Sequence, residues 1–229
     1  MNKEWFYNLK KLLRPRSRLQ EAIFALKHNK FGIIPTQNLI LDLWNGHLCG
    51  GVIPTRFSEA GAYQTQHTDY RCLDEIFFHN DLEITNDDVL VDIGCGKGRV
   101  ISFWARRKFG RRLVGIELDP DAAEVSAKRF EGCNNISIIN GDAVEHLPLD
   151  GTVFYLWNPF NEAVMRRFAD KLIRSADQMS NVRVIYNNCR HADVFTSNPV
   201  WETRPMSNKD VYPAILATLK CGVKTGEAA

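Results

Sequence analysis

The chain has 229 residues, of which 45% are hydrophobic and 24% are charged, and its formal net charge is +2. This composition is that of a globular protein and excludes a disordered or low-complexity chain. No apolar run approaches the roughly 20 residues of a membrane-spanning helix, and the first residues lack a signal-peptide core, so we expect a cytoplasmic protein with no membrane span.

Two helices are predicted near the N-terminus, over residues 5–13 and 19–27, from apolar residues at helical spacing, and Pro15 ends the first of them. The following stretch, residues 32–67, is rich in glycine and contains Pro35. It predicts loops and short pieces, some of which cap a site.

The pattern becomes regular from residue 69 onward. A helix over residues 69–79 precedes five short β-branched runs, at residues 89–93, 113–116, 136–139, 152–157 and 182–186. Helical stretches separate these runs, at residues 98–109, 119–130 and 160–176, and Asp119 is the expected cap of the second. Two extended segments between residues 201 and 219 predict a closing hairpin. Strands that alternate with helices predict an α/β fold, a doubly wound and mostly parallel sheet with helices on both faces.

These patterns divide the chain into three parts. We expect an N-terminal helical and loop extension over residues 1–68, a main domain over residues 69–222 and a tail over residues 223–229. The first 30 residues carry eight Lys or Arg and two acids, a net charge of +6, which leaves −4 for the remainder. Such a segment can bind nucleic acid or an acidic partner, although a solvated helical arm is the plainer interpretation.

The cysteines predict neither a metal site nor a disulfide framework. None of the six forms a CxxC pair, and their spacing fits no zinc pattern, so we expect reduced thiols and no metal.

A glycine-rich loop follows the first β-branched run. Its glycines stand at alternate positions, which lets the backbone approach a ligand closely: Gly94, Gly96 and Gly98. Acids stand at the ends of three strands, at Asp92, Glu117 and Asp142. A pyrophosphate there would meet like charge, whereas a cationic nucleoside would be favoured. S-adenosylmethionine has such a cation, and its ribose hydroxyls suit a carboxylate at Glu117.

Four motifs carry a family resemblance: VDIGCGKGRV, GIELDP, NGDA and WNPF. In this order they resemble the signature corners of class I S-adenosylmethionine-dependent methyltransferases, over about residues 88–160. The resemblance implies a Rossmann-like, seven-stranded sheet with an antiparallel last hairpin, and S-adenosyl-L-methionine as the cofactor. The glycine loop and WNPF also look like a poorly described bacterial group, some of whose members resemble Dot1-type lysine methyltransferases in their core.

The resemblance implies a role for each corner. The glycine loop, with Cys95 as a small residue of its tight turn, would surround the methionine part, and Asp92 would orient the loop or bind the amino group through water. Glu117 would hold the ribose hydroxyls. The adenine would be bound by Leu118, Asp142 and Ala143.

The segment before the first core helix is expected to close over the cofactor, as it does in many members of this fold. Its candidate contacts are Tyr63, Thr65 and Thr68.

Asn158, Pro159 and Phe160 are the candidate catalytic residues. Asn followed by Pro can offer a side-chain oxygen and a backbone carbonyl to an amine, and Phe160 can lie beneath a planar or cationic group. Families that methylate nitrogens resemble this motif but carry a second proline, which is missing here. We expect a nitrogen acceptor, on a protein lysine or a small molecule. In the competing interpretation the motif is a strand-end turn with a packed Phe160.

Two other functions are compatible with parts of the sequence. A methyltransferase-like fold could act as a docking module for nucleic acid or protein through residues 1–30. An NAD-dependent oxidoreductase would share the glycine loop and the ribose acid, but the GxGxG spacing, Asp92 and Asp142 argue against it.

Overall fold

A computed structural model of the chain describes residues 33–44, 49, 54–64, 68–208 and 212–220. The chain forms two units, residues 1–51 and 52–229. The helices predicted over residues 5–13 and 19–27 lie outside the described residues, as do Thr65 and the tail. No helix of the described part is long and apolar enough to cross a membrane.

The first unit contains helix α3, Ile33–Trp44. The prediction of loops and short pieces over this stretch was therefore wrong. Pro35 stands at the third helical position, within the first turn, where backbone N–H groups have no helical partner and proline is tolerated. After the helix, Asp42 Oδ2 accepts a hydrogen bond from the backbone N–H of Cys49 at 2.9 Å.

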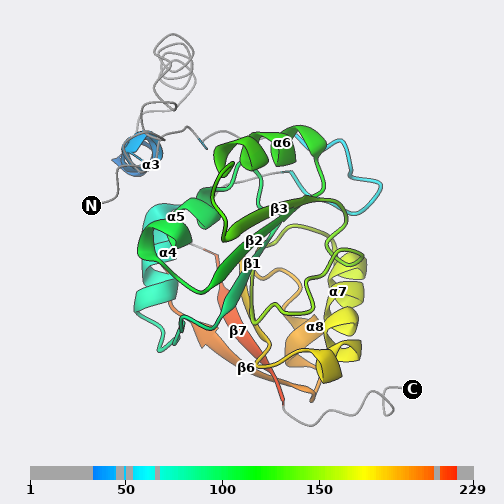
Figure 1. The fold of residues 1–229 in the computed structure, drawn as a ribbon. Coiled ribbons are helices and arrows are strands. Elements are labelled where there is room, and N and C mark those ends of the chain that lie inside the picture. The colour runs from blue at the N-terminus through cyan, green and yellow to red at the C-terminus, as the bar shows by residue number, and fades with distance from the viewer. Residues whose placement is uncertain (1–32, 45–48, 50–53, 65–67, 209–211, 221–229) are drawn as a thin grey trace. The chain divides into compact units, whose positions relative to one another are not determined.

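The second unit is built on a seven-stranded sheet in the order β3-β2-β1-β4-β5-β7-β6 (Figure 1). The strands β1 to β5 are parallel to one another, and β7 is antiparallel to both of its neighbours, β5 and β6. This arrangement confirms the predicted doubly wound α/β class and its closing hairpin. The strand bounds are Val89–Ile93, Arg112–Glu117, Ile136–Asn140, Val153–Trp157, Arg183–Asn187, Trp201–Met206 and Ala214–Leu219.

Helices cover both faces of the sheet. The helices α4 and α5 lie on one side of the strands, and α7 and α8 lie on the other (Figure 1). Helix α6 packs on β2 and β3. The helix bounds are Tyr70–Phe78 for α4, Arg99–Arg107 for α5, Pro120–Arg129 for α6, Glu162–Arg174 for α7 and Asp193–Thr196 for α8, with a 3-10 turn at Ala176–Gln178.

Side-chain caps fix where two of these helices begin. Asp119 accepts from the backbone N–H groups of Asp121 and Ala122, at 2.9 and 3.2 Å, which confirms its predicted role at α6. Asn161 accepts from Val164 N at 3.1 Å. Helix α7 therefore begins after Asn161, two residues later than the sequence pattern predicted.

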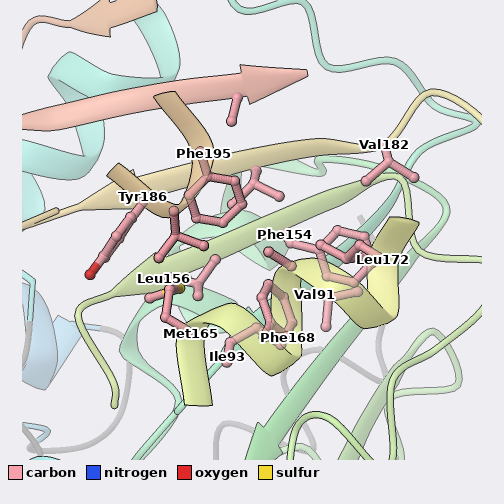
Figure 2. Packing of buried hydrophobic residues seen from close by; sticks show 14 of the residues in the cluster. Val91, Ile93, Phe154, Leu156, Met165, Phe168, Leu172, Val182, Tyr186 and Phe195 are labelled. Carbon is pink, nitrogen blue, oxygen red and sulfur yellow. The ribbon is translucent and has the colours of Figure 1, made fainter. Parts of the chain in front are cut away.

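Alternation along the strands sends side chains to different faces of the sheet. Figure 2 shows the hydrophobic core on one face of the sheet, where β1 and β4 side chains pack against α7 and α8. Phe154 meets Phe168 with ring centroids 6.1 Å apart. On the opposite face Tyr155 packs against Phe77 of α4 and Trp104 of α5. Asp92 alternates with the core-facing residues of β1, so it faces the same way as Tyr155, its register partner in β4.

A buried ion pair ties the amino-terminal ends of the central strands together. Asp88 pairs with Arg183, and their side chains are only 7% and 17% exposed. Asp88 Oδ1 also accepts from Thr152 Oγ1 at 2.6 Å. Burial opposes ionisation of Asp88, but the hydrogen bonds from Thr152 and Thr85 and the charge of Arg183 outweigh it and lower its pKa.

We expect Asp88→Ala to lower the free energy of unfolding by about 3 kcal/mol, because it leaves the Arg183 guanidinium buried without its partner. Urea unfolding at neutral pH measures this loss. The exposed Asp87→Ala is the matched control, with an expected change within about 0.5 kcal/mol. Because the pKa of Asp88 is lowered on folding, the difference between wild type and Asp88→Ala should shrink as the pH falls through that pKa. Equal stability of the two variants would contradict this role.

Candidate active site

A cavity lies at the carboxyl ends of β1, β2 and β4, where the strand order changes direction and doubly wound folds bind their ligands. It encloses roughly 1070 Å³, counting the part open to solvent. Its walls come from the glycine loop, from the ends of β2 and β4, from the turn after β3 and from the segment 54–64.

The glycine loop is fixed to the end of β2 by its own backbone. Gly94 N and Cys95 N both donate to the carbonyl of Ile116, at 2.9 and 3.1 Å. The three glycines have φ values of 75°, 52° and 79°, a region that side-chain-bearing residues rarely adopt. A Cβ on Gly98 would come within 2.7 Å of the Phe130 ring. The loop therefore needs glycine both for its path and for its packing.

Glu117 holds the loop from the side of β2. Its Oε2 accepts from Gly96 N at 2.7 Å, and its Oε1 accepts from Asp119 N at 2.9 Å. The residue is 6% exposed and lines the cavity. Burial raises its pKa, although the backbone N–H groups of Asp119 and Gly96 oppose that shift. Each carboxylate oxygen can accept a second hydrogen bond from a ligand.

Asp92 has a buried carboxyl group with an unused oxygen. The residue is 3% exposed, and its Oδ2 has no hydrogen-bond partner among the described residues. Burial, with a smaller contribution from the charge of Glu117, raises its pKa well above the ordinary value. An unpaired buried carboxylate of this kind is costly, and a cationic group in the cavity would relieve that cost.

The turns after β2 and β3 supply the other predicted cofactor contacts. Leu118, Asp142 and Ala143 all line the cavity. Asp142 also caps its own turn, since its Oδ1 accepts from Val144 N at 2.7 Å. Asn140 Nδ2 donates to the carbonyl of Glu117 at 2.9 Å and so joins the two turns.

The segment 54–64 forms a wall that the sequence located only approximately. Its Tyr63 N donates to the carbonyl of Pro159 at 2.9 Å, and Ala62 and Phe160 form an antiparallel bridge. Arg56 pairs with Asp119 and Asp121 at the start of α6, at 3.2 and 2.7 Å. The segment is thereby attached to both ends of the cavity. No local pattern marked Arg56, because its partners lie more than 60 residues away along the chain.

The WNPF corner is a strained turn whose polar atoms have protein partners. Asn158 has a φ of 45°, and its Oδ1 accepts from the Tyr186 hydroxyl at 2.7 Å. The carbonyl of Pro159 accepts from Tyr63 N. Phe160 lines the cavity and also packs on Phe168 in the core, with centroids 5.9 Å apart. Asn158 Oδ1 and the Pro159 carbonyl oxygen, the atoms that could bind an amine, therefore each already accept one hydrogen bond within the protein. The catalytic role of this corner stays a prediction.

Most of the predicted site residues meet at this one cavity. Those that line it are Tyr63, Thr68, Asp92, Gly94, Cys95, Glu117, Leu118, Asp142, Ala143, Pro159 and Phe160. Gly96, Gly98 and Asn158 support the walls without lining them. The sequence analysis did not single out several of the lining residues, among them Phe57, Arg99, Tyr155 and Trp157. Arg99 and Trp157 stand inside the quoted motifs, whereas Tyr155 is an interior strand residue with no motif of its own.

The remaining titratable groups suggest no further chemistry. Burial raises the pKa of Cys95 well above its ordinary value, which disfavours the reactive thiolate. No group of three metal-binding side chains gathers in the part of the chain that the structure describes. His191 Nε2 lies 3.4 Å from the Tyr63 hydroxyl at the edge of the cavity.

The fold and this site define a doubly wound domain that binds a nucleoside at the glycine loop. Residues 90–192 match the family model described as "Methyltransferase domain". The match confirms the resemblance to class I S-adenosylmethionine-dependent methyltransferases and, with it, the predicted cofactor.

Some of the relatives carry the names of RNA methyltransferases. An uncharacterized RNA methyltransferase of Oceanobacillus iheyensis is 25% identical over 179 residues, which cover 73% of this chain and 36% of that protein. A probable ribosomal RNA small subunit methyltransferase A of Methanosarcina mazei is 36% identical over 63 residues, which cover 28% of this chain and 22% of that protein. The chain thus spans well under two thirds of the length of these relatives.

One solved structure shows the same fold at low sequence identity. The pyocyanin biosynthetic protein PhzM aligns with a TM-score of 0.51 at 15% identity, over 66% of this chain and 55% of that one.

The residues of the cavity fit S-adenosylmethionine. The unpartnered Oδ2 of Asp92 suits a positively charged group, and the Glu117 carboxylate is placed to accept from the ribose hydroxyls. A Cβ on Gly94 would lie 3.1 Å from Pro159, so glycine keeps this cradle open.

Glu117→Gln is expected to weaken the binding of S-adenosylhomocysteine about 10- to 100-fold, because the amide has one acceptor oxygen for the two backbone N–H groups that the carboxylate holds. Isothermal titration measures the affinity. The control is Glu124→Gln on the exposed side of α6, which should bind as wild type does. An unchanged affinity of Glu117→Gln would remove Glu117 from the site.

The variant Asp92→Asn should gain stability relative to wild type as the pH rises, and it should bind S-adenosylmethionine more weakly. Because the pKa of Asp92 is raised on folding, the wild type loses stability as the pH rises from about 4 through the raised pKa, and the amide variant has no such loss. The free energy of unfolding of the variant, relative to wild type, should therefore increase between pH 4 and pH 7 in urea titrations without ligand. Its affinity for S-adenosylmethionine should fall roughly tenfold. A variant that loses stability relative to wild type as the pH rises would contradict the raised pKa.

Proposed function

We propose that this protein is an S-adenosylmethionine-dependent methyltransferase that acts on a nitrogen atom of its acceptor. The observation that carries the proposal is the pair of buried carboxyl groups, Asp92 and Glu117, at one glycine-lined cavity. Asp92 has an oxygen without a hydrogen-bond partner among the described residues, and Glu117 is placed to accept hydrogen bonds from the ribose hydroxyls.

Bound S-adenosylmethionine would supply an activated methyl group: the nitrogen–carbon bond forms as the carbon–sulfur bond breaks, the electron pair goes to sulfur, and the nitrogen loses a proton to water. The chain itself needs mainly to align and desolvate the two partners. The segment 54–64 and the glycine loop both line the cavity in which this alignment would take place.

The carboxyl groups of the cavity serve the cofactor or cap turns, and the other groups that line it support a nitrogen acceptor. No histidine is among the described residues that line the cavity. Burial raises the pKa of Tyr155 well above its ordinary value, so its hydroxyl stays protonated. A nitrogen with a free lone pair can attack without a protein base, whereas a hydroxyl acceptor needs one.

The names of the relatives favour nucleic acid as the source of that nitrogen. Both relatives described above are called RNA methyltransferases. The basic first 30 residues, with a net charge of +6, are compatible with a polyanionic partner. A protein lysine and a small molecule are the other acceptor classes that the sequence predicted.

Isothermal titration with S-adenosylmethionine, S-adenosylhomocysteine and NAD tests the proposal. We expect micromolar affinity for the first two and no binding of NAD, because Asp92 and Asp142 would repel a pyrophosphate. The double variant Asp92→Asn, Glu117→Gln is the control for binding at this cavity. Binding of NAD in preference to the sulfur nucleosides would indicate an oxidoreductase. Binding of none of them would favour a docking module.

A further inference from the structure

The segment 54–64 joins the end of β2 to the end of β4 (Figure 1). Its Arg56 contacts the start of α6, which follows β2, and its Gly61 contacts the start of α7, which follows β4. Strand β1 lies between these two strands in the sheet. The segment therefore crosses the end of β1, where Asp92 and the glycine loop line the cavity, and residues of the segment line it as well.

Backbone hydrogen bonds attach the segment at α7. Asn161 N donates to the carbonyl of Gly61 at 2.8 Å, and Tyr63 N donates to the carbonyl of Pro159 at 2.9 Å. Gly61 has a φ of 83°, and a Cβ there would come within 2.7 Å of the Asn161 side chain. This end of the segment is therefore packed tightly. These contacts involve no charged side chain, so salt has little effect on them.

Ion pairs of a single arginine attach the segment at α6. Arg56 Nη2 lies 3.2 Å from Asp119 Oδ2 and 2.7 Å from Asp121 Oδ2. No backbone hydrogen bond joins residues 54–60 to the other described parts of the chain. The side chains of Arg56 and Asp121 are 60% and 79% exposed, so solvent and salt weaken their attraction. The α6 end is thus the weaker of the two attachments.

The ion pairs of Arg56 stand beside the corner that fits the ribose. Asp119 lines the cavity, and its backbone N–H donates to Glu117 Oε1 at 2.9 Å. Arg56 itself does not line the cavity. Its guanidinium therefore acts on the position of the segment and not directly on a ligand, and it has the same carboxylate partners with the cavity empty or filled.

The unequal attachments indicate which end of the segment opens. An exposed segment with few buried contacts opens locally at a low free-energy cost. We infer that the cofactor enters and leaves at the α6 end of the segment 54–64, and that Arg56 is its latch, the contact that must break before this end opens. The α7 end is the hinge. The inference rests on the cofactor of the proposed function and not on its methyl acceptor.

A latch of this kind sets the rates of cofactor exchange without setting the affinity. The ion pairs break before entry and before release, so their loss accelerates both steps by the same factor. A residue that stabilised the bound cofactor would instead change the rate of release and the affinity together. The two rate constants therefore distinguish a latch from a binding residue.

The test is the kinetics of S-adenosylhomocysteine binding to the full-length protein, measured by surface plasmon resonance. We expect Arg56→Gln to raise both the association and the dissociation rate constant about threefold, as the loss of exposed ion pairs permits. Asp121→Asn, which removes one partner, should raise both in the same direction. The dissociation constant from isothermal titration should stay within about twofold of the wild-type value in both variants.

Arg166 gives the matched control. Its Nη2 bonds Glu162 at 2.6 Å and Asp193 at 3.0 Å, so it also holds two exposed carboxylates, but it joins α7 to α8. Arg166→Gln should leave both rate constants as they are in wild type.

Salt tests the electrostatic nature of the latch. An increase from about 50 mM to about 500 mM salt should raise both wild-type rate constants toward those of Arg56→Gln, because salt screens exposed ion pairs. The same increase should change the rate constants of Arg56→Gln much less. S-adenosylhomocysteine carries one ammonium and one carboxylate group, so salt has little effect on its own approach.

Unchanged rate constants in Arg56→Gln, or an equal increase in Arg166→Gln, would overturn the latch. A faster dissociation without a faster association would also overturn it, because Arg56 would then stabilise the bound state. Failure of the wild-type protein to bind S-adenosylhomocysteine would overturn the cofactor and the proposed function with it, so the failures are distinct.

Discussion

The hydrogen bonds of the Glu117 carboxylate are the interaction on which the site depends. One oxygen accepts from the glycine loop and the other accepts from the first residue after Leu118, so a single side chain joins the end of β1, the end of β2 and the start of α6. Together with the bonds of Gly94 N and Cys95 N to Ile116, these contacts hold three alternating glycines at positive φ, where glycine has the largest conformational entropy to lose. The group placed to hold a ribose also builds the cavity that receives it.

The cavity leaves one carboxylate oxygen without a protein partner. Asp92 Oδ2 is buried and has no hydrogen-bond partner among the described residues. Folding usually avoids such atoms because their desolvation is not compensated. Asp92 lines the cavity, so a cation bound there can compensate the missing partner.

The segment 54–64 completes the cavity through contacts with residues that are far away along the chain. Arg56 reaches the start of α6, and Tyr63 reaches Pro159, so this one segment joins the nucleoside end to the acceptor end. The hydrogen bond to Pro159 also changes the meaning of the WNPF motif. Its carbonyl supports a wall of the cavity, as Asn158 supports the turn through Tyr186.

The sequence by itself determined the local features of this protein. β-Branched runs, glycine spacing and the cap at Asp119 depend on neighbours within a few residues, so the sheet, the glycine loop and the acids at the strand ends could be predicted. The helix at Ile33–Trp44 could not, because the glycines and prolines of residues 32–67 indicate loops, although Pro35 stands in a first turn, where proline is tolerated. Only the tertiary structure decided that Phe57 and Tyr155 belong to the cavity and that Arg56 attaches the segment 54–64 to the start of α6. Those facts depend on which distant strands become neighbours, and no local pattern records hydrogen bonds that join residues far apart in the chain.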